Sequence, residues 1–160
     1  NMSGDFGGHR EKLAYYQFGS AFQSDRFLSP PDPRAIHDRG RGGHGSFQID
    51  ARPNADNSLR MMVMGDGTNF DIPVPPLDER LRPAAKAREW TRQQTAIVGW
   101  SRAFSSNALL HTSFYKRWSR SRLLPASGPL TAIADTDRRL LTVGVKSDVT
   151  RLAGRHTFSI

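Results

Sequence analysis

Apolar and polar side chains alternate along most of this chain. Between Arg139 and Thr150, for example, Leu141 and Val143 alternate with Thr142 and Gly144. A period of two places alternate side chains on opposite faces of a β-strand. On this pattern we predict six strands and the start of a seventh. They cover residues 11–24, 44–52, 58–66, 88–104, 108–120 and 139–150, and the last begins near 155.

The alternation differs in clarity from strand to strand. The strand expected over 58–66 alternates poorly, because methionine occurs on both of its faces. Leu59 and Met61 share one face, and Arg60 and Met62 share the other. In the strand expected over 11–24, the even positions carry Tyr16, Phe18 and Phe22, and the odd positions from 17 on carry Gln17, Gly19, Ala21 and Gln23. We therefore take the even side of that strand as its apolar face.

The connections between these strands alternate between short and long. Short links lie near residues 53–57, 105–107 and 152–154, and long links rich in Pro, Gly and charge lie near 26–43, 67–86 and 123–137. In an up-and-down meander, every second connection lies at the same end of the sheet. Transmembrane barrels have short turns at the periplasmic end and long loops at the external end. The rhythm predicts an all-β, antiparallel up-and-down meander of about six to seven long strands, a segment of a transmembrane β-barrel.

This arrangement assigns sides to particular residues. Asn54, Ser106 and Ala153 are expected at the periplasmic rim, and Pro31, Pro75 and Gly128 at the cell exterior. The segments 39–43 and 73–76 are rich in Gly, Arg and Pro, which resist forming regular strands. We expect both segments to belong to external loops.

The lengths of the predicted strands also favour a membrane. Strands in soluble proteins average roughly 5–6 residues, and a tilted transmembrane strand needs roughly 9–11. Residues 88–104 and 108–120 exceed both values. Trp90, Arg92 and Gln94 share the apolar side of the first of these strands, so we expect them above the membrane, with the apolar band beginning near Ala96.

Aromatic residues fit girdles at the two membrane interfaces. The alternative is that they pack inside a soluble β-sandwich. On the membrane interpretation the predicted lipid-facing aromatics are Tyr16, Phe18, Phe22, Trp100, Phe104, Phe114 and Trp118.

Composition narrows the choice further. The 160 residues are 37% hydrophobic, with 14 Gly, 10 Pro, no Cys and a mean hydropathy of -0.56. A barrel wall with one polar face has such a composition, and without cysteine there is no disulfide scaffold. The net charge of +8 invites a nucleic-acid interpretation, but no helical recognition element accompanies it.

Three segments resemble the barrel of TonB-dependent outer-membrane receptors. They are Ala14-Tyr15-Tyr16-Gln17-Phe18-Gly19-Ser20, Gln93-Gln94-Thr95-Ala96-Ile97-Val98-Gly99-Trp100 and the closing Leu152-Ala153-Gly154-Arg155-His156-Thr157-Phe158. The resemblance covers most of the chain and its motifs are diffuse. It implies that residues 1–160 are an internal part of such a barrel, with no plug domain and no signal peptide within them.

The resemblance also implies a function and a location. Such receptors lie in the bacterial outer membrane and take up scarce ligands such as siderophores or cobalamin. The implied partners are outer-membrane lipids and lipopolysaccharide, the rest of the barrel and its plug, a small-molecule ligand, and an inner-membrane energy-transducing complex. The alternatives are a passive porin-like barrel and a soluble basic β-domain that binds nucleic acid or another anion; we favour the receptor, with no nucleic-acid partner.

Basic residues at the outer ends of the strands expected over 108–120 and 139–150 are the best functional candidates. They are Lys116, Arg117, Arg120, Arg122, Arg138 and Arg139. Outward-facing cations at this height would pair with lipopolysaccharide phosphates, because guanidinium matches phosphate bidentately. Inward-facing ones would attract an anionic ligand, and the plain alternative is a solvated loop rim.

Other constellations are weak. His37, Asp38 and His44 match no metal-binding spacing, and no nucleophile elbow or phosphate-binding loop occurs. We therefore expect no enzyme activity, no metal site and no cofactor.

Overall fold

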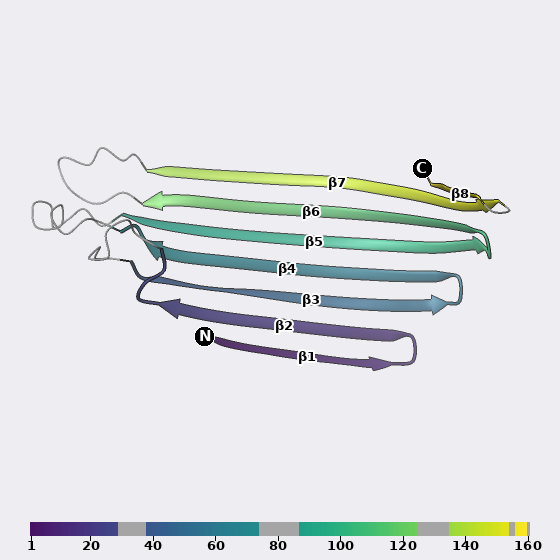
Figure 1. Cartoon of the computed structure of the whole chain (residues 1–160), viewed down its shortest axis with the longest axis horizontal. Helices are drawn as coiled ribbons and strands as arrows, with labels where there is room; N and C mark the ends of the chain where they lie inside the picture. The colour runs from purple at the N-terminus through teal and green to yellow at the C-terminus, as the bar shows by residue number, and fades with distance from the viewer. Residues whose placement is uncertain (29–37, 74–86, 125–134, 154–155, 160) are drawn as a thin grey trace, which may run out of the picture.

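The computed structural model is a single antiparallel sheet of eight strands that follow one another in chain order (Figure 1). It describes residues 1–28, 38–73, 87–124, 135–153 and 156–159. The strands are β1 Met2–Arg10, β2 Leu13–Ser24, β3 Gly40–Asn54, β4 Asn57–Asp71, β5 Arg88–Ser105, β6 Ala108–Leu124, β7 Thr136–Ala153 and β8 His156–Ser159.

The expected all-β antiparallel meander is confirmed, with one strand more than the six to seven expected. The additional strand is β1, and the strand expected from Glu11 begins at Leu13. Glycines at positions 4, 7 and 8 weaken the alternation of β1. The β1–β2 turn places Glu11 at a φ of 46°, a conformation that favours Gly or Asn, so its sequence carries no turn signal.

The alternation of short and long connections is confirmed and extends to the new hairpin. Two-residue turns at Glu11–Lys12, Ala55–Asp56 and Ser106–Asn107 lie at one end of the sheet, on the right of Figure 1. The long connections all leave from the opposite end. Asn54, Ser106 and Ala153 therefore share one rim, as expected, whereas Pro31, Pro75 and Gly128 lie outside the described residues.

Several strands extend further than the sequence predicts. Gly40–Gly43, expected in a loop, belongs to β3 and pairs with both β2 and β4. Glycine is required there because side chains come close. A Cβ on Gly40 would meet the ring of Phe27 at 2.2 Å, and one on Gly42 would meet Phe22 at 2.8 Å. The glycines therefore admit aromatic rings rather than ending the strand.

The sheet is one layer with two free edges. Each described strand contacts only its sequence neighbours, so β1 and β8 do not meet, and no other described strand covers either face. Among the described residues, only Asp38, Gly40, Ala87 and Gly99 are buried. A small cluster near the long-connection end buries Asp38 and Gly40: Phe27 stacks on Phe22 with ring centroids 5.7 Å apart, and the Leu28 backbone N–H donates to Asp38 Oδ1 (2.6 Å). Gly99 lies apart from this cluster, beside the ring of His111.

The register divides the side chains between two faces. Cross-strand partners share a face, so one row of pairs fixes the rest. We call the face that carries Ile49, Met61, Val98, Phe114 and Val145 the apolar face. The opposite face carries Gln48, Thr95, Ser113 and Lys146, and we call it the polar face.

Candidate functional site

The apolar face is a band of uncovered hydrophobic side chains between charged ends. On β7, Leu141, Val143 and Val145 are 59%, 51% and 66% exposed. Arg139 and Arg151 bound this run on the same face. Their twelve-residue separation is about 40 Å at about 3.3 Å per residue, or about 28 Å of height at a tilt of about 45°. The height of this band matches the roughly 25 Å apolar band of a membrane barrel.

All three tryptophans lie on the apolar face. Trp90 and Trp100 are on β5, and Trp118 is on β6. The Trp100 Nε1–H donates to Asn57 Oδ1 at 3.1 Å, at the short-turn end. Trp90 lies at the other end, where the guanidinium carbons of Arg92 and Arg120 are 4.5 and 5.5 Å from its ring. The sheet thus has an amphipathic aromatic residue near each end of its apolar band.

The seven aromatics predicted to face lipid do not share one face. Trp100, Phe114 and Trp118 are on the apolar face. Tyr16, Phe18 and Phe22 are on the polar face, because β2 pairs them with Gln48, Ser46 and Gly42. Phe104 lies in the register shift between Ala103 and Ser105 and is 59% exposed.

Tyr16, Phe18 and Phe22 therefore lie on the opposite face of the sheet from Trp100, Phe114 and Trp118, so these side chains do not all face one environment. Phe18 and Phe22 join local ring contacts on the polar face. Phe18 lies 5.1 Å from the ring of His44, and Phe22 stacks on Phe27.

A row of arginines crosses three adjacent strands above the apolar band. Arg92 on β5 pairs with Arg120 on β6, which pairs with Arg139 on β7. Asp137 neutralises part of this row. Arg120 Nε and Nη2 donate to its two carboxylate oxygens at 2.8 and 2.7 Å, and Arg139 Nη2 donates at 2.8 Å. These hydrogen bonds, first from Arg120 and then from Arg139, hold the pKa of Asp137 well below its usual range.

The six predicted basic residues are likewise split by the register. Lys116, Arg120, Arg122 and Arg139 are on the apolar face, and Arg117 and Arg138 are on the polar face. Arg122 Nη2 donates to Asp135 Oδ2 at 3.0 Å, and Arg117 Nη2 donates to Gln93 Oε1 at 2.7 Å. Arg92 was expected above the membrane but not as a site residue, because only the β5–β6 register brings it beside Arg120.

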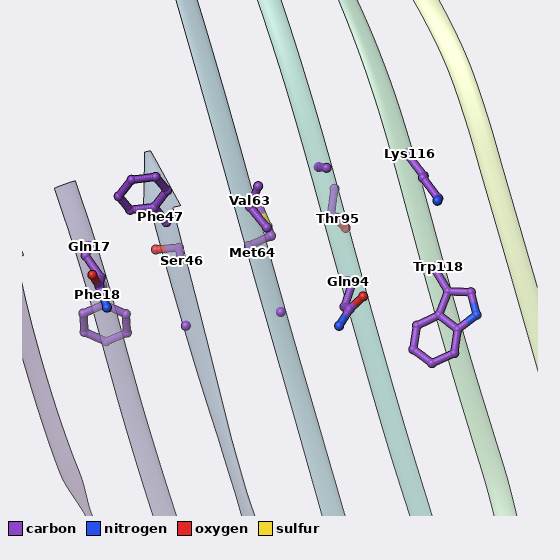
Figure 2. Close-up of a pocket in the computed structure, with 13 residues that line it drawn as sticks. Gln17, Phe18, Ser46, Phe47, Val63, Met64, Gln94, Thr95, Lys116 and Trp118 are labelled. Carbon is purple, nitrogen blue, oxygen red and sulfur yellow. The ribbon is translucent and has the colours of Figure 1, made fainter. Parts of the chain in front are cut away.

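A hollow lies on the apolar face directly below this row (Figure 2). Its volume is about 530 Å³. Gly45 and Gly65, a cross-strand pair, leave the floor without side chains. In Figure 2, Phe47 and Trp118 stand on opposite sides, with Val63 and Gln94 between them. Lys116 also lines the hollow, so this lysine within the apolar band lies beside open space.

The polar face carries two serine–histidine contacts. Ser20 Oγ lies 2.9 Å from His44 Nδ1, and Ser101 Oγ lies 2.8 Å from His111 Nδ1. A triad needs serine and carboxylate on opposite ring nitrogens. Asp66 and Asp148 are the cross-strand partners of His44 and His111, but no hydrogen bond or ion pair joins either carboxylate to its histidine among the described residues, and Asp148 pairs with Lys146 instead.

Other chemistry finds no support in the described ranges. They contain no group of three or more His, Cys, Asp or Glu that could hold a metal ion. No helix long and apolar enough to cross a membrane occurs in them. His37 lies outside the described residues. The predicted absence of a metal site, cofactor and enzyme activity stays a prediction.

No protein family matches the chain, and no curated protein is significantly similar to it.

Proposed function

We propose that this chain is part of the wall of a β-barrel in the bacterial outer membrane. The uncovered apolar face carries the proposal. A sheet in water buries such a face against a second layer, and nothing covers this one among the described residues. Lipid is the cover whose thickness matches the distance between the charged ends of β7.

The strands and edges support the same proposal. β5, β6 and β7 have 18, 17 and 18 residues, long enough to cross the hydrocarbon and rise beyond it. The free edges of β1 and β8 expose unpaired backbone groups, which a bilayer does not tolerate. In the proposed barrel, further strands pair with both edges.

Within this class we propose a TonB-dependent receptor that takes up a scarce nutrient with energy from the inner membrane. The support is the resemblance of the three sequence segments described above. Arg117 and Arg138, on the polar face, are then candidates for attracting an anionic ligand in the lumen. The passive porin remains the second candidate, because it has the same two-faced wall.

Native tryptophan fluorescence tests the membrane proposal. Because Trp90, Trp100 and Trp118 share the apolar face, brominated lipids should quench most of the emission of the intact protein in vesicles when any tryptophan outside these 160 residues is replaced by Phe. A water-soluble quencher should have a weaker effect. Strong quenching by the water-soluble reagent with none by brominated lipids would show that this face is not in lipid.

Transport assays separate the receptor from the porin. Deleting the gene should abolish growth on one limiting siderophore or cobalamin source, and dissipating the proton-motive force should stop uptake in the wild type. Uptake that persists without the proton-motive force would favour the porin.

A further inference from the structure

The arginine row has more positive charge than its own carboxylates neutralise. Arg92, Arg120 and Arg139 lie side by side on strands about 4.8 Å apart, an arrangement that like charges disfavour. Asp137 pairs with Arg120 and Arg139, whereas Arg92 has no carboxylate partner in the described part of the chain. One row higher, Arg122 pairs with Asp135, but its Nε is buried without a hydrogen-bond partner. Within the row, the exposed Arg92 therefore has guanidinium donors free for an anion from outside the chain.

The hollow below the row gives the shape of the ligand. Gln94 and Trp118, which line it, lie two residues below Arg92 and Arg120 on the same face. On β5 the polarity falls from Arg92 through Gln94 to Ala96, and Phe47 and Val63 continue the apolar lining on β3 and β4. On β6, Lys116 lies opposite Ala96 and is the one charged side chain among the described residues that line the hollow. A ligand that fits has an anionic head at the arginines and an apolar chain along the glycine floor.

We propose that this part of the apolar face binds a phosphate-bearing lipid. Arg92 and Arg120 hold the headgroup phosphate, and an acyl chain lies in the hollow over Gly45 and Gly65. Arginine is the side chain best matched to phosphate, and Trp90 keeps both guanidinium groups in place through its ring. The site rests on the proposed function, since it needs this face to be in a membrane.

Binding of matched lipids to the intact protein, measured by native mass spectrometry in detergent, tests the site. Phosphatidic acid should bind at least about tenfold more tightly than diacylglycerol with the same chains, because charge-assisted hydrogen bonds to phosphate are lost. Inorganic phosphate in excess should not displace the lipid. Equal binding of the two lipids would overturn the proposal, and displacement by phosphate alone would show that the acyl chain has no site.

Two matched pairs of variants locate the site. Arg92→Gln should weaken phosphatidic acid binding about tenfold, and Arg138→Gln, with the same charge change on the polar face, should leave it unchanged. Gly65→Leu fills the hollow and should weaken binding several-fold. Gly19→Leu is the control in the same cross-strand row; it does not line the hollow, and a Cβ there meets nothing within 4 Å.

Equal losses within either pair would contradict the site. The failure of this proposal is distinguishable from that of the proposed function. If brominated lipids still quench the tryptophans while the two lipids bind equally, the face is in lipid and the specific site does not exist.

Discussion

Adjacent methionines on β4 give the sharpest mutational test of the two faces. Met61 lies on the apolar face between Ile49 and Val98, and Met62 lies on the polar face between Gln48 and Ile97. Met61 is four residues from Asn57 at the short-turn rim, about 13 Å along the strand and about 9 Å in height at a tilt of about 45°. An arginine at position 61 is therefore inside the hydrocarbon, between its boundary at the short-turn end and its mid-plane.

The two arginine substitutions should therefore differ strongly. A charged side chain on the lipid face costs about 2–4 kcal/mol at mid-plane and about 0–1 near the interface, so Met61→Arg should cost about 2 kcal/mol. Met62→Arg reaches water on the polar face and should cost less than about 0.5 kcal/mol.

Urea unfolding of the intact protein from vesicles, followed by tryptophan fluorescence, measures the change in the free energy of unfolding for both variants. We expect a loss of about 2 kcal/mol for Met61→Arg and almost none for Met62→Arg. Equal losses, or a larger loss for Met62→Arg, would refute the assignment of faces on β4.

Three further predictions follow from the same geometry. Lys116→Leu should raise the unfolding free energy by about 1 kcal/mol in phosphate-free, neutral bilayers, because it removes a cation from the apolar band, while Lys146→Leu on the polar face should not raise it; equal gains would contradict the faces of β6 and β7. Gly40→Ala should lower the midpoint of thermal unfolding, since its Cβ would meet the Phe27 ring at 2.2 Å, and Phe27→Ala in the same chain should remove that added penalty; a neutral Gly40→Ala would show that the ring lies elsewhere. In uptake and detergent-sensitivity assays, Arg117→Ser with Arg138→Ser should slow uptake of an anionic ligand, whereas Arg120→Ser with Arg122→Ser should raise detergent sensitivity; the reverse pattern would show that the two pairs are on the wrong faces.

The sequence was sufficient for the fold class because two local signals agreed. The period of two marked β5, β6 and β7, where most apolar side chains fall on one face. The turns at Ala55–Asp56 and Ser106–Asn107 have Asn, Asp and Ser, which favour turns. In the β1–β2 turn, the position with positive φ carries Glu11 and not the Gly or Asn that favours this conformation. Both the turn and the strand before it therefore escaped prediction.

The faces of β2 were out of reach for a physical reason. Its hydrophobic residues fall on both sides, with Tyr16 and Phe18 on one and Leu13 and Tyr15 on the other. Only the partner strand decides between them, and β3 pairs the even side with Ser46 and Gln48. Register is a property of two strands and of the connection between them.

The candidate site was predictable in part. A period of two on β6 already separates Arg117 from Arg120 and Arg122, so that division was open to sequence reasoning. The row that joins Arg92 to Arg120 and Arg139 was not, because these residues lie far apart in the chain. The hollow over Gly45 and Gly65 also depends on pairing, since two isolated glycines have no shape until the strands align.

The most direct test of the two-faced wall is a spin-label scan along β7. These 160 residues have no cysteine, so single substitutions to Cys from Leu141 to Val149, in the intact protein with any cysteine elsewhere replaced by Ser, give unique label sites. In vesicles of the intact protein, odd positions should be more accessible to oxygen, which concentrates in lipid, and even positions more accessible to a water-soluble nickel complex. Accessibility without this period of two, or with the odd positions facing the nickel complex, would contradict the central claim that the apolar face lies in a membrane.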